Sequence, residues 1–321
     1  MKRRQFVKRA VQASGTLSLL GFAACKNEKR HKNSELQADL ETHPELFFKM
    51  SLAQWSLHRT LFDKKMDHLD FASKSRGFGF EGLEYVNSFF KDKAKAMPYL
   101  KEMKLRADAE GQENVLIMID GEGALANSNT NERLKAIENH YKWIEAAHFL
   151  GCHAIRVNLA GSSGKAEAVK VSIDSLEKLS DFAINSNINI LVENHGGFSS
   201  NSEWMTSVFS QVKNENCGTL PDFGNFCITK HKDGHCLEKY DRYKGMRELL
   251  PYAKALSAKS YDFNEAGDDT LIDYYKIMKM VKDSGYKGFI GVEYEGDIKP
   301  EEEGIKLTRN LLIKVGRQLS L

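Results

Sequence analysis

Four acidic residues stand at or just after the ends of short apolar runs that have the character of β-strands. They are Glu84 in FEGLEYVN, Glu193 in ILVENHGG, Asp222 in GTLPDFGN and Glu293 in GFIGVEYEG. If these runs are parallel strands of one barrel, their carboxyl ends share one face and the side chains converge there. Clustered carboxylates coexist by sharing protons or by binding a metal ion. Their oxygens suit Mg²⁺ or Mn²⁺ and are acceptable to Zn²⁺.

The elements that must position these residues alternate between β-rich runs and amphipathic segments. We expect strands over 48–55, 82–86, 115–119, 154–159, 188–192, 219–222, 253–259 and 288–294. Helical periodicity is found over 93–103, 131–150, 166–185, 269–284 and 301–318. This α/β pattern predicts a single (β/α)8 TIM barrel over residues 46–321. A doubly wound open sheet is the alternative, but the first strand is not followed by a glycine-rich phosphate turn.

The N-terminal segment differs from the rest of the chain. Residues 1–24 join a basic head, with paired Arg3 and Arg4, to a mildly apolar stretch too interrupted to span a bilayer. This pattern predicts an export signal and resembles a twin-arginine signal peptide. The residues up to Cys25 also resemble a lipoprotein processing site, which would leave a lipid on Cys25 and a polar tether over 25–45. We therefore expect a periplasmic protein, released by simple cleavage, or a membrane-anchored lipoprotein.

Charge and cysteine usage exclude some partners. Residues 1–24 carry five basic and no acidic side chains, so their removal turns the formal net charge from +2 to −3. This charge, without a basic stripe interleaved with aromatics, argues against nucleic acid as a partner. Four cysteines follow Cys25 with no CxxC pair, which argues against a structural zinc site. Cys152, Cys217, Cys227 and Cys236 are either buried thiols or include a disulfide.

Most of the chain after residue 45 resembles the xylose-isomerase-like barrel superfamily of sugar isomerases and epimerases, in particular the sugar phosphate isomerase/epimerase proteins. The most specific motifs are LVENHGG, LPDFGNF, ALSAKSYDF and GVEYEG, with weaker support from LAQWSLH and GLEYVN. The resemblance implies a divalent metal (Mn²⁺, Mg²⁺, Co²⁺ or Zn²⁺) held by a Glu, an Asp, a His and a second Glu. Glu193, Asp222 and Glu293 match three of these positions.

The His position of the family pattern holds Ser257 in this chain. A serine hydroxyl is a poor ligand beside a neutral imidazole. The metal therefore has fewer protein ligands, another residue such as His195 replaces the His, or the site works without metal. Lys259 makes better sense as a charge that binds an oxyanion or partly replaces the cation.

Such a site suits abstraction of a proton next to a sugar carbonyl, because a metal or a lysine stabilises the enediolate while a carboxylate takes the proton. We predict Glu193 and Glu293 as the catalytic pair. The residues expected to contact sugar hydroxyls or to wall the pocket are Glu84, Arg156, His195, Asn225, Lys259, Gln54, Trp55 and His58. Trp55 could equally belong to the barrel core, and Asp120 in IMIDGEG could equally belong to the site or to a turn.

The leading function is an exported isomerase or epimerase acting on a small-molecule carbohydrate. A lyase or hydratase of 3-keto-glycosides would use the same enolate chemistry, and a non-catalytic sugar-binding protein is kept open by Ser257. Phosphodiester cleavage is disfavoured, because the abasic-DNA endonuclease on this barrel needs several zinc ions and many histidines. His231 and His235 are expected on a solvated loop covering the pocket, since Asp233-Gly234 favours a turn.

Overall fold

The structure is a computed structural model that describes residues 45–161 and 163–321. The predicted export signal, the Cys25 processing site and nearly all of the predicted tether lie outside the described residues. Within the part of the chain that is described, no helix is both long enough and apolar enough to cross a membrane.

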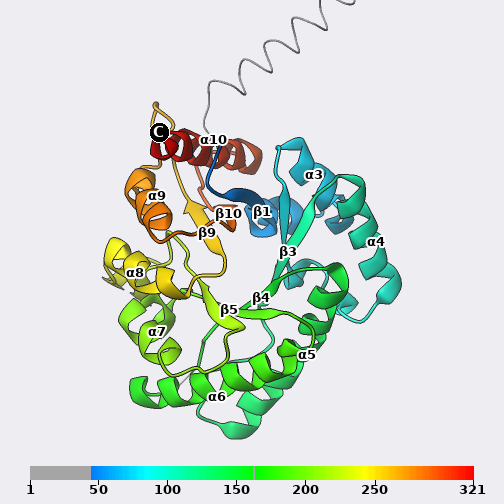
Figure 1. The fold of residues 1–321 in the computed structure, drawn as a ribbon, viewed down its shortest axis with the longest axis vertical. Helices are drawn as coiled ribbons and strands as arrows, with labels where there is room; N and C mark the ends of the chain where they lie inside the picture. Colours follow the sequence, from blue (N-terminus) through cyan, green and yellow to red (C-terminus); the bar gives the residue numbers. More distant parts are fainter. Residues whose placement is uncertain (1–44, 162) are drawn as a thin grey trace, which may run out of the picture. The chain divides into compact units, whose positions relative to one another are not determined.

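Eight parallel strands form a nearly closed barrel, which confirms the predicted TIM barrel (Figure 1). The strands are β1 (Lys49–Ala53), β2 (Gly82–Val86), β3 (Glu113–Met118), β4 (Ala154–Val157), β5 (Asn189–Glu193), β6 (Cys217–Leu220), β9 (Leu256–Ser260) and β10 (Phe289–Tyr294). Their order is β6-β5-β4-β3-β2-β1-β10-β9. Two isolated bridges, Thr219 with Ala253 and Asp222 with Ser257, close the seam between β6 and β9 in place of a continuous ladder.

Helices surround the strands on the outside of the barrel (Figure 1). They are α2 (His58–Phe62), α3 (Phe71–Gly77), α4 (Met97–Ala109), α5 (Thr130–Leu150), α6 (Lys165–Ile184), α7 (Ser202–Phe209), α8 (Arg242–Leu249), α9 (Tyr274–Asp283) and α10 (Glu301–Ser320). The core between helices and strands contains fully buried apolar side chains such as Trp143, Leu176 and Leu312. Each side chain of this kind contributes roughly 1.5–3 kcal/mol through burial, so the helix ring holds the strand ends in place.

Local capping explains where α5 begins and ends. The Asn129 side chain accepts hydrogen bonds from the backbone N–H groups of Asn131 and Glu132, which would otherwise lack partners at the first turn. Gly151 ends the helix with φ 83°, a left-handed conformation that glycine adopts without steric cost. The chain then turns directly into β4, whose Arg156 belongs to the site.

Several predicted boundaries shift for identifiable reasons. The first strand ends at Ala53, because the 3-10 helix η1 (Gln54–Leu57) follows it. The predicted strand 219–222 spans Cys217–Leu220, and Pro221, which has no N–H to donate, follows it. The predicted helix 269–284 begins only at Tyr274, where the Asp273 side chain accepts a hydrogen bond from the Lys276 N–H.

A small antiparallel hairpin, predicted as a loop, lies outside the barrel sheet. It consists of β7 (Cys227–Lys230) and β8 (Cys236–Lys239). A disulfide joins Cys227, the first residue of β7, to Cys236, the first residue of β8. Cys152 and Cys217 are free thiols. The sequence left both states open for these cysteines, and the structure contains both.

Candidate functional site

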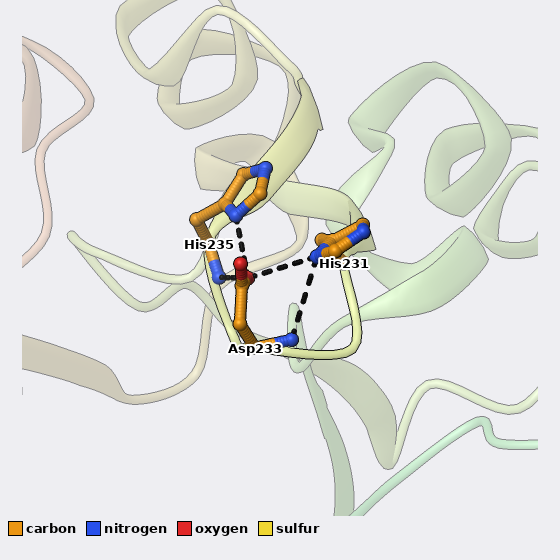
Figure 2. Close-up of side chains that lie close together, drawn as sticks. All are labelled: His231, Asp233 and His235. Atoms are coloured by element: carbon orange, nitrogen blue, oxygen red, sulfur yellow. Dashed lines mark hydrogen bonds and ion pairs between the residues drawn. The ribbon is translucent and has the colours of Figure 1, made fainter.

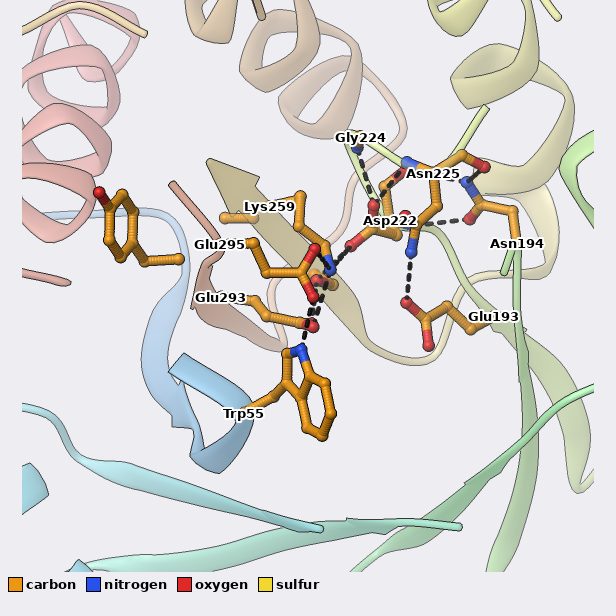
Figure 3. Close-up of polar contacts among 12 residues, drawn as sticks. Trp55, Glu193, Asn194, Asp222, Gly224, Asn225, Lys259, Glu293 and Glu295 are labelled. Atoms are coloured by element: carbon orange, nitrogen blue, oxygen red, sulfur yellow. Dashed lines mark hydrogen bonds and ion pairs between the residues drawn. The ribbon is translucent and has the colours of Figure 1, made fainter. Parts of the chain in front are cut away.

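Glu193, Asp222 and Glu293 converge at the carboxyl end of the barrel, as predicted (Figure 3). Each offers a carboxylate oxygen, and these oxygens all lie within 4.8 Å of one another. The three residues are 2%, 0% and 4% exposed. Oxygen ligands bind divalent ions at about 2.0–2.6 Å, so one ion between them would reach all three. The carboxylate geometry therefore fits a divalent metal.

Asp222 is held by its own loop. Its Oδ1 accepts hydrogen bonds from the backbone N–H groups of Gly224 and Asn225, both at 2.8 Å. Its backbone N–H donates to Asn194 Oδ1 at 2.7 Å. A Cβ on Gly224 would lie 2.6 Å from Lys259 Cγ, so only glycine fits this turn beside the site. The motif LPDFGN thus fixes the direction of one carboxylate.

Ser257 lies between two of the carboxylates, at the position where the family pattern has His. Its Oγ is 2.6 Å from Asp222 Oδ2 and 3.0 Å from Glu293 Oε2. A hydroxyl has only one hydrogen to donate, so it satisfies one carboxylate at a time. Ser257 can add a weak neutral oxygen to the ligand set, and the three carboxylates would carry the metal binding.

Lys259 reaches the same cluster from the next position on that face of β9. Its ammonium is 2.8 Å from Glu293 Oε1, 3.1 Å from Glu295 Oε2 and 4.0 Å from Asp222 Oδ2. Glu293 and Lys259 are register partners on adjacent strands, so their side chains leave the sheet together. Burial alone would lower the pKa of Lys259, but the charges of Glu293 and Asp222 outweigh it and raise that pKa well above its ordinary value. The lysine is therefore a permanent cation in the cluster.

Arg156 balances the other side of the site. Its Nε is 2.9 Å from Glu193 Oε2, and its Nη1 donates to Asp120 Oδ1 at 2.7 Å. Asn225 Nδ2 donates to Glu193 Oε1 at 3.1 Å. Asp120, which the sequence left between site and turn, thus contacts the residue that holds Glu193. Burial would raise its pKa, but Arg156 lowers it overall.

The local charge balance also favours a cation. Burial raises the pKa of both Glu193 and Asp222, although Arg156 opposes the rise for Glu193 and Lys259 opposes it for Asp222. Two fixed cations therefore leave the carboxylates incompletely neutralised. A divalent ion held by Glu193, Asp222 and Glu293 would supply the missing positive charge.

Glu84 lies within β2 and not at its end, which corrects its predicted position. Its Oε1 accepts a hydrogen bond from Ser51 Oγ at 2.5 Å, and its Oε2 has no hydrogen-bond partner among the described residues. A Cβ at Gly291 would lie 2.4 Å from that oxygen, so the glycine leaves space for the carboxylate. Burial raises the pKa of Glu84 to about 8. Glu84 is a protonatable group inside the barrel.

A cavity of about 330 Å³ borders the cluster through Asn225 and Lys259, which donate hydrogen bonds to Glu193 and Glu293. Its lining includes Trp55, His195, Asn225, Lys259, Tyr261 and Glu295. A second cavity of about 440 Å³ also has His195 and Lys230 in its lining, so the two adjoin. Together they offer a pocket with both polar and apolar walls, of the size that holds a small organic ligand.

Three aromatic and polar residues after β1 have different positions. Trp55 Nε1 donates to Glu295 Oε1 at 2.5 Å, so the indole is part of the pocket wall (Figure 3). His58 stacks on Trp55 with ring centroids 4.9 Å apart. Gln54 was expected to wall the pocket, but it is fully buried and its Oε1 accepts from the Val86 N–H. The start of η1 turns the amide inward and the indole outward.

Glu295 and Tyr261 are pocket residues that the sequence reasoning missed. Glu295 follows Glu293 by two positions in GVEYEG, and residues two apart on a strand share a face. That spacing was the available signal. Tyr261 follows β9 directly and carried no comparable signal. Arg156 and Glu84 are buried and absent from the lining of the described cavities, so their predicted contact with sugar hydroxyls stays a prediction.

His231 and His235 lie on the tip of the hairpin, exposed and beside Asp233 (Figure 2). Neither lines the two cavities, whereas Cys227 and Lys230, the first and last residues of β7, line both. The expected solvated turn is present, and the hairpin borders the pocket through β7.

Several solved structures share this fold. A D-psicose 3-epimerase from Clostridium cellulolyticum H10, solved with D-tagatose, matches with a TM-score of 0.58 and 14% identity over 85% of this chain and 96% of its own. A 3-keto-D-glucoside 4-epimerase from E. coli matches with a TM-score of 0.58 and 13% identity over 84% and 99%. A sugar phosphate isomerase/epimerase from Parabacteroides distasonis matches with a TM-score of 0.64 and 15% identity over 85% and 96%.

One further neighbour carries a metal. A xylose isomerase-like TIM barrel protein from Mycobacterium smegmatis, in complex with magnesium, matches with a TM-score of 0.62 and 14% identity over 88% of this chain and 99% of its own. A search of curated proteins found no match. The family model described as "Xylose isomerase-like TIM barrel" matches residues 72–315. The chain belongs to the xylose isomerase-like TIM barrel family.

Proposed function

We propose that this protein is an isomerase- or epimerase-like enzyme that abstracts a proton next to the carbonyl of a sugar. The observation that carries the proposal is the placement of Glu193 and Glu293 on separate strands around one cluster, with the Lys259 ammonium 2.8 Å from Glu293. A carboxylate can take the proton, and a fixed cation can stabilise the charge that develops on the substrate oxygen.

The site residues have three roles: to act as the base, to orient that base, and to supply positive charge. Asn225 and Arg156 orient Glu193, while Lys259 and Ser257 orient Glu293. Carboxylates on two sides of a sugar allow a proton to leave from one face and return on either. A divalent ion bound to Glu193, Asp222 and Glu293 would supply Lewis-acid stabilisation of the enediolate oxygen. Trp55 would exclude water from one side of the pocket.

The comparisons support sugars as the substrate class. Neighbours of the same fold are epimerases acting on ketohexoses and on a 3-keto-glucoside. We propose that the chain is exported, as the pattern of residues 1–24 suggests. It would then be released into the periplasm or anchored to the membrane by a lipid on Cys25. Because sugar phosphates are mostly cytoplasmic, an unphosphorylated keto-sugar is then the expected substrate. A lyase or hydratase acting on 3-keto-glycosides would use the same enolate step and is the second candidate.

Deuterium exchange tests the proposal directly. The purified protein is incubated in D₂O with ketohexoses or 3-keto-glucosides, with Mg²⁺, Mn²⁺, Co²⁺, Zn²⁺ or no added metal. Uptake of deuterium at the carbon beside the carbonyl, followed by NMR, is the expected result. Loss of the neighbouring substituent together with uptake would identify the lyase. Saturable binding of a sugar without deuterium uptake would overturn the proposal that the protein is an enzyme and would favour a sugar-binding protein.

A further inference from the structure

The tip of the β7–β8 hairpin brings three potential metal ligands together, well exposed to solvent. Asp233 Oδ1 is 3.0 Å from His231 Nδ1 and 2.5 Å from His235 Nδ1 (Figure 2). The side chains of His231, Asp233 and His235 are 49%, 61% and 58% exposed. The ligand atoms of all three lie within 4.8 Å of one another.

The backbone of the hairpin fixes this arrangement. The His231 N–H donates to the His235 carbonyl at 2.8 Å, which pairs the two histidines across the hairpin. Gly234 has φ 93°, a left-handed value that glycine allows in a tight turn. Asp233 Oδ1 also accepts from the His235 backbone N–H at 3.1 Å. The two imidazole rings stack with centroids 4.7 Å apart. The ligands are therefore arranged before any ion binds.

We propose that His231, Asp233 and His235 form a second metal site, for a borderline divalent ion such as Zn²⁺. Two imidazole nitrogens and one carboxylate oxygen are a ligand set that suits Zn²⁺, Cu²⁺ or Ni²⁺ better than Mg²⁺. Ligands about 2.0–2.2 Å from a tetrahedral zinc lie roughly 3.3 Å apart, so the carboxylate and the imidazoles need only small shifts. Solvent access leaves room for a water as fourth ligand.

The charge of the turn agrees with this assignment. The Asp233 carboxylate accepts a hydrogen bond from the His235 backbone N–H and lies 3.0 Å from His231 Nδ1, so it brings negative charge between the two rings. At present both imidazoles direct Nδ1 at one carboxylate oxygen. An ion between them would take the place of the hydrogen bonds among these atoms.

The position of the site gives it a structural consequence. The disulfide between Cys227 and Cys236 already links the two strands of the hairpin, and an ion would link three residues of the turn between them. Cys227, Ile228 and Lys230 line the larger cavity. A metal at the tip would therefore stiffen one wall of the pocket without touching Glu193, Asp222 or Glu293. The proposal does not depend on the proposed function.

Zinc titration of the metal-stripped full chain tests the site. Calorimetry is performed with excess Mg²⁺ present to fill the carboxylate cluster, and bound metal is counted by elemental analysis. The unaltered protein is expected to bind one Zn²⁺ that Mg²⁺ does not displace. His231→Gln and His235→Gln should each weaken this binding by at least about tenfold, since each removes one of three protein ligands.

Two controls separate this site from others. His148→Gln removes an exposed histidine on α5, and a His31→Gln/His43→Gln double variant removes two histidines of the N-terminal segment. Both should keep the Zn²⁺ affinity of the unaltered protein. The proposal is overturned if the hairpin variants bind Zn²⁺ normally, or if Glu193→Gln removes the zinc that is resistant to Mg²⁺, because the ion would then lie in the buried cluster.

Discussion

The barrel carries two ligand clusters that differ in burial, charge and scaffold. Glu193, Asp222 and Glu293 are buried and neutralised in part by Lys259 and Arg156. The histidines and Asp233 of the hairpin tip are exposed and, within residues 45–161 and 163–321, bond to one another and to their own turn. A buried charge must be compensated because desolvation is costly, whereas water compensates an exposed one. Substitutions should therefore change the barrel site strongly and the hairpin weakly.

The largest difference is expected in catalysis. Glu193→Gln and Glu293→Gln keep the size of each side chain and remove the base, so deuterium exchange should fall by about 10²–10⁴-fold. Glu238→Gln, an exposed carboxylate change on β8, should leave exchange unaltered. Exchange is measured by NMR, and folding is checked by circular dichroism. Normal turnover in both barrel variants would show that the catalytic pair is wrongly assigned.

Stability should separate the clusters next. Lys259→Met leaves Glu293 and Glu295 without their buried cation, and removal of one partner from such a pair costs about 3–5 kcal/mol. Lys232→Ala on the hairpin should change the free energy of unfolding by less than about 0.5 kcal/mol. Urea unfolding without metal gives both values. Added Mg²⁺ should stabilise Lys259→Met more than the unaltered protein. Equal stabilisation would argue that a metal does not neutralise the carboxylates that Lys259 neutralises.

Metal affinity of the buried cluster should respond to position 257. Ser257→His places an imidazole between Asp222 and Glu293, which should raise Mn²⁺ or Co²⁺ affinity by about tenfold or more, equivalent to at least about 1.4 kcal/mol. Calorimetry on the metal-stripped variant measures the change, and thermal unfolding in chelator verifies that it folds. Unchanged affinity would count against the correspondence of this serine to the family's histidine.

The pH dependence of stability should report on Glu84. Its pKa rises from the ordinary 4.5 to about 8 on folding, so the folded state keeps a proton that the unfolded state loses. This stabilisation is complete below about pH 4.5 and disappears as pH rises toward 8, by at most about 1.4 kcal/mol per pH unit. Glu84→Gln should reduce this slope, as urea unfolding at several pH values would show, while Glu193 and Asp222, whose pKa values are also raised, keep the rest of it. An unaltered slope would assign it to other groups.

The smallest effect is expected from the disulfide of the hairpin. A Cys227→Ser/Cys236→Ser double variant removes the disulfide but keeps the hydrogen bond that pairs His231 with His235. Zn²⁺ affinity should fall by only a few-fold, about 1 kcal/mol, because the turn still arranges the ligands. Calorimetry against the unaltered protein measures the loss. Complete loss of zinc binding would show that the disulfide, not the turn, organises the tip.

The strand ends could be predicted because periodicity and acidic residues coincide there. Glu193 and Glu293 follow unbroken apolar runs, which are typical of strands buried on both faces. Their convergence then followed from barrel topology alone. The prediction that Glu84 lies at the end of its strand was wrong, because Glu84 is the central residue of β2. The motif GLEYV gives no sign that its glutamate faces the barrel interior.

The hairpin could not be predicted in the same way. Its segment is short and polar, and KHKDGHC is read equally well as a plain turn. Disulfide pairing depends on distances between chain segments, which sequence does not contain. Short helices such as α7 and α8 give too few turns for a clear period. Tertiary packing decides these elements.

Ligand binding should stabilise the barrel at the seam between β6 and β9. Asp222 and Ser257 form one of its two bridges, and Asp222 belongs to the cluster shared with Glu293 across the seam. An ion or substrate bound by both Asp222 and Glu293 would hold β6 and β9 together where the barrel has the fewest strand-to-strand hydrogen bonds. Amide protons of Ser257 and Phe223, which bond across that seam, would exchange more slowly in the occupied protein.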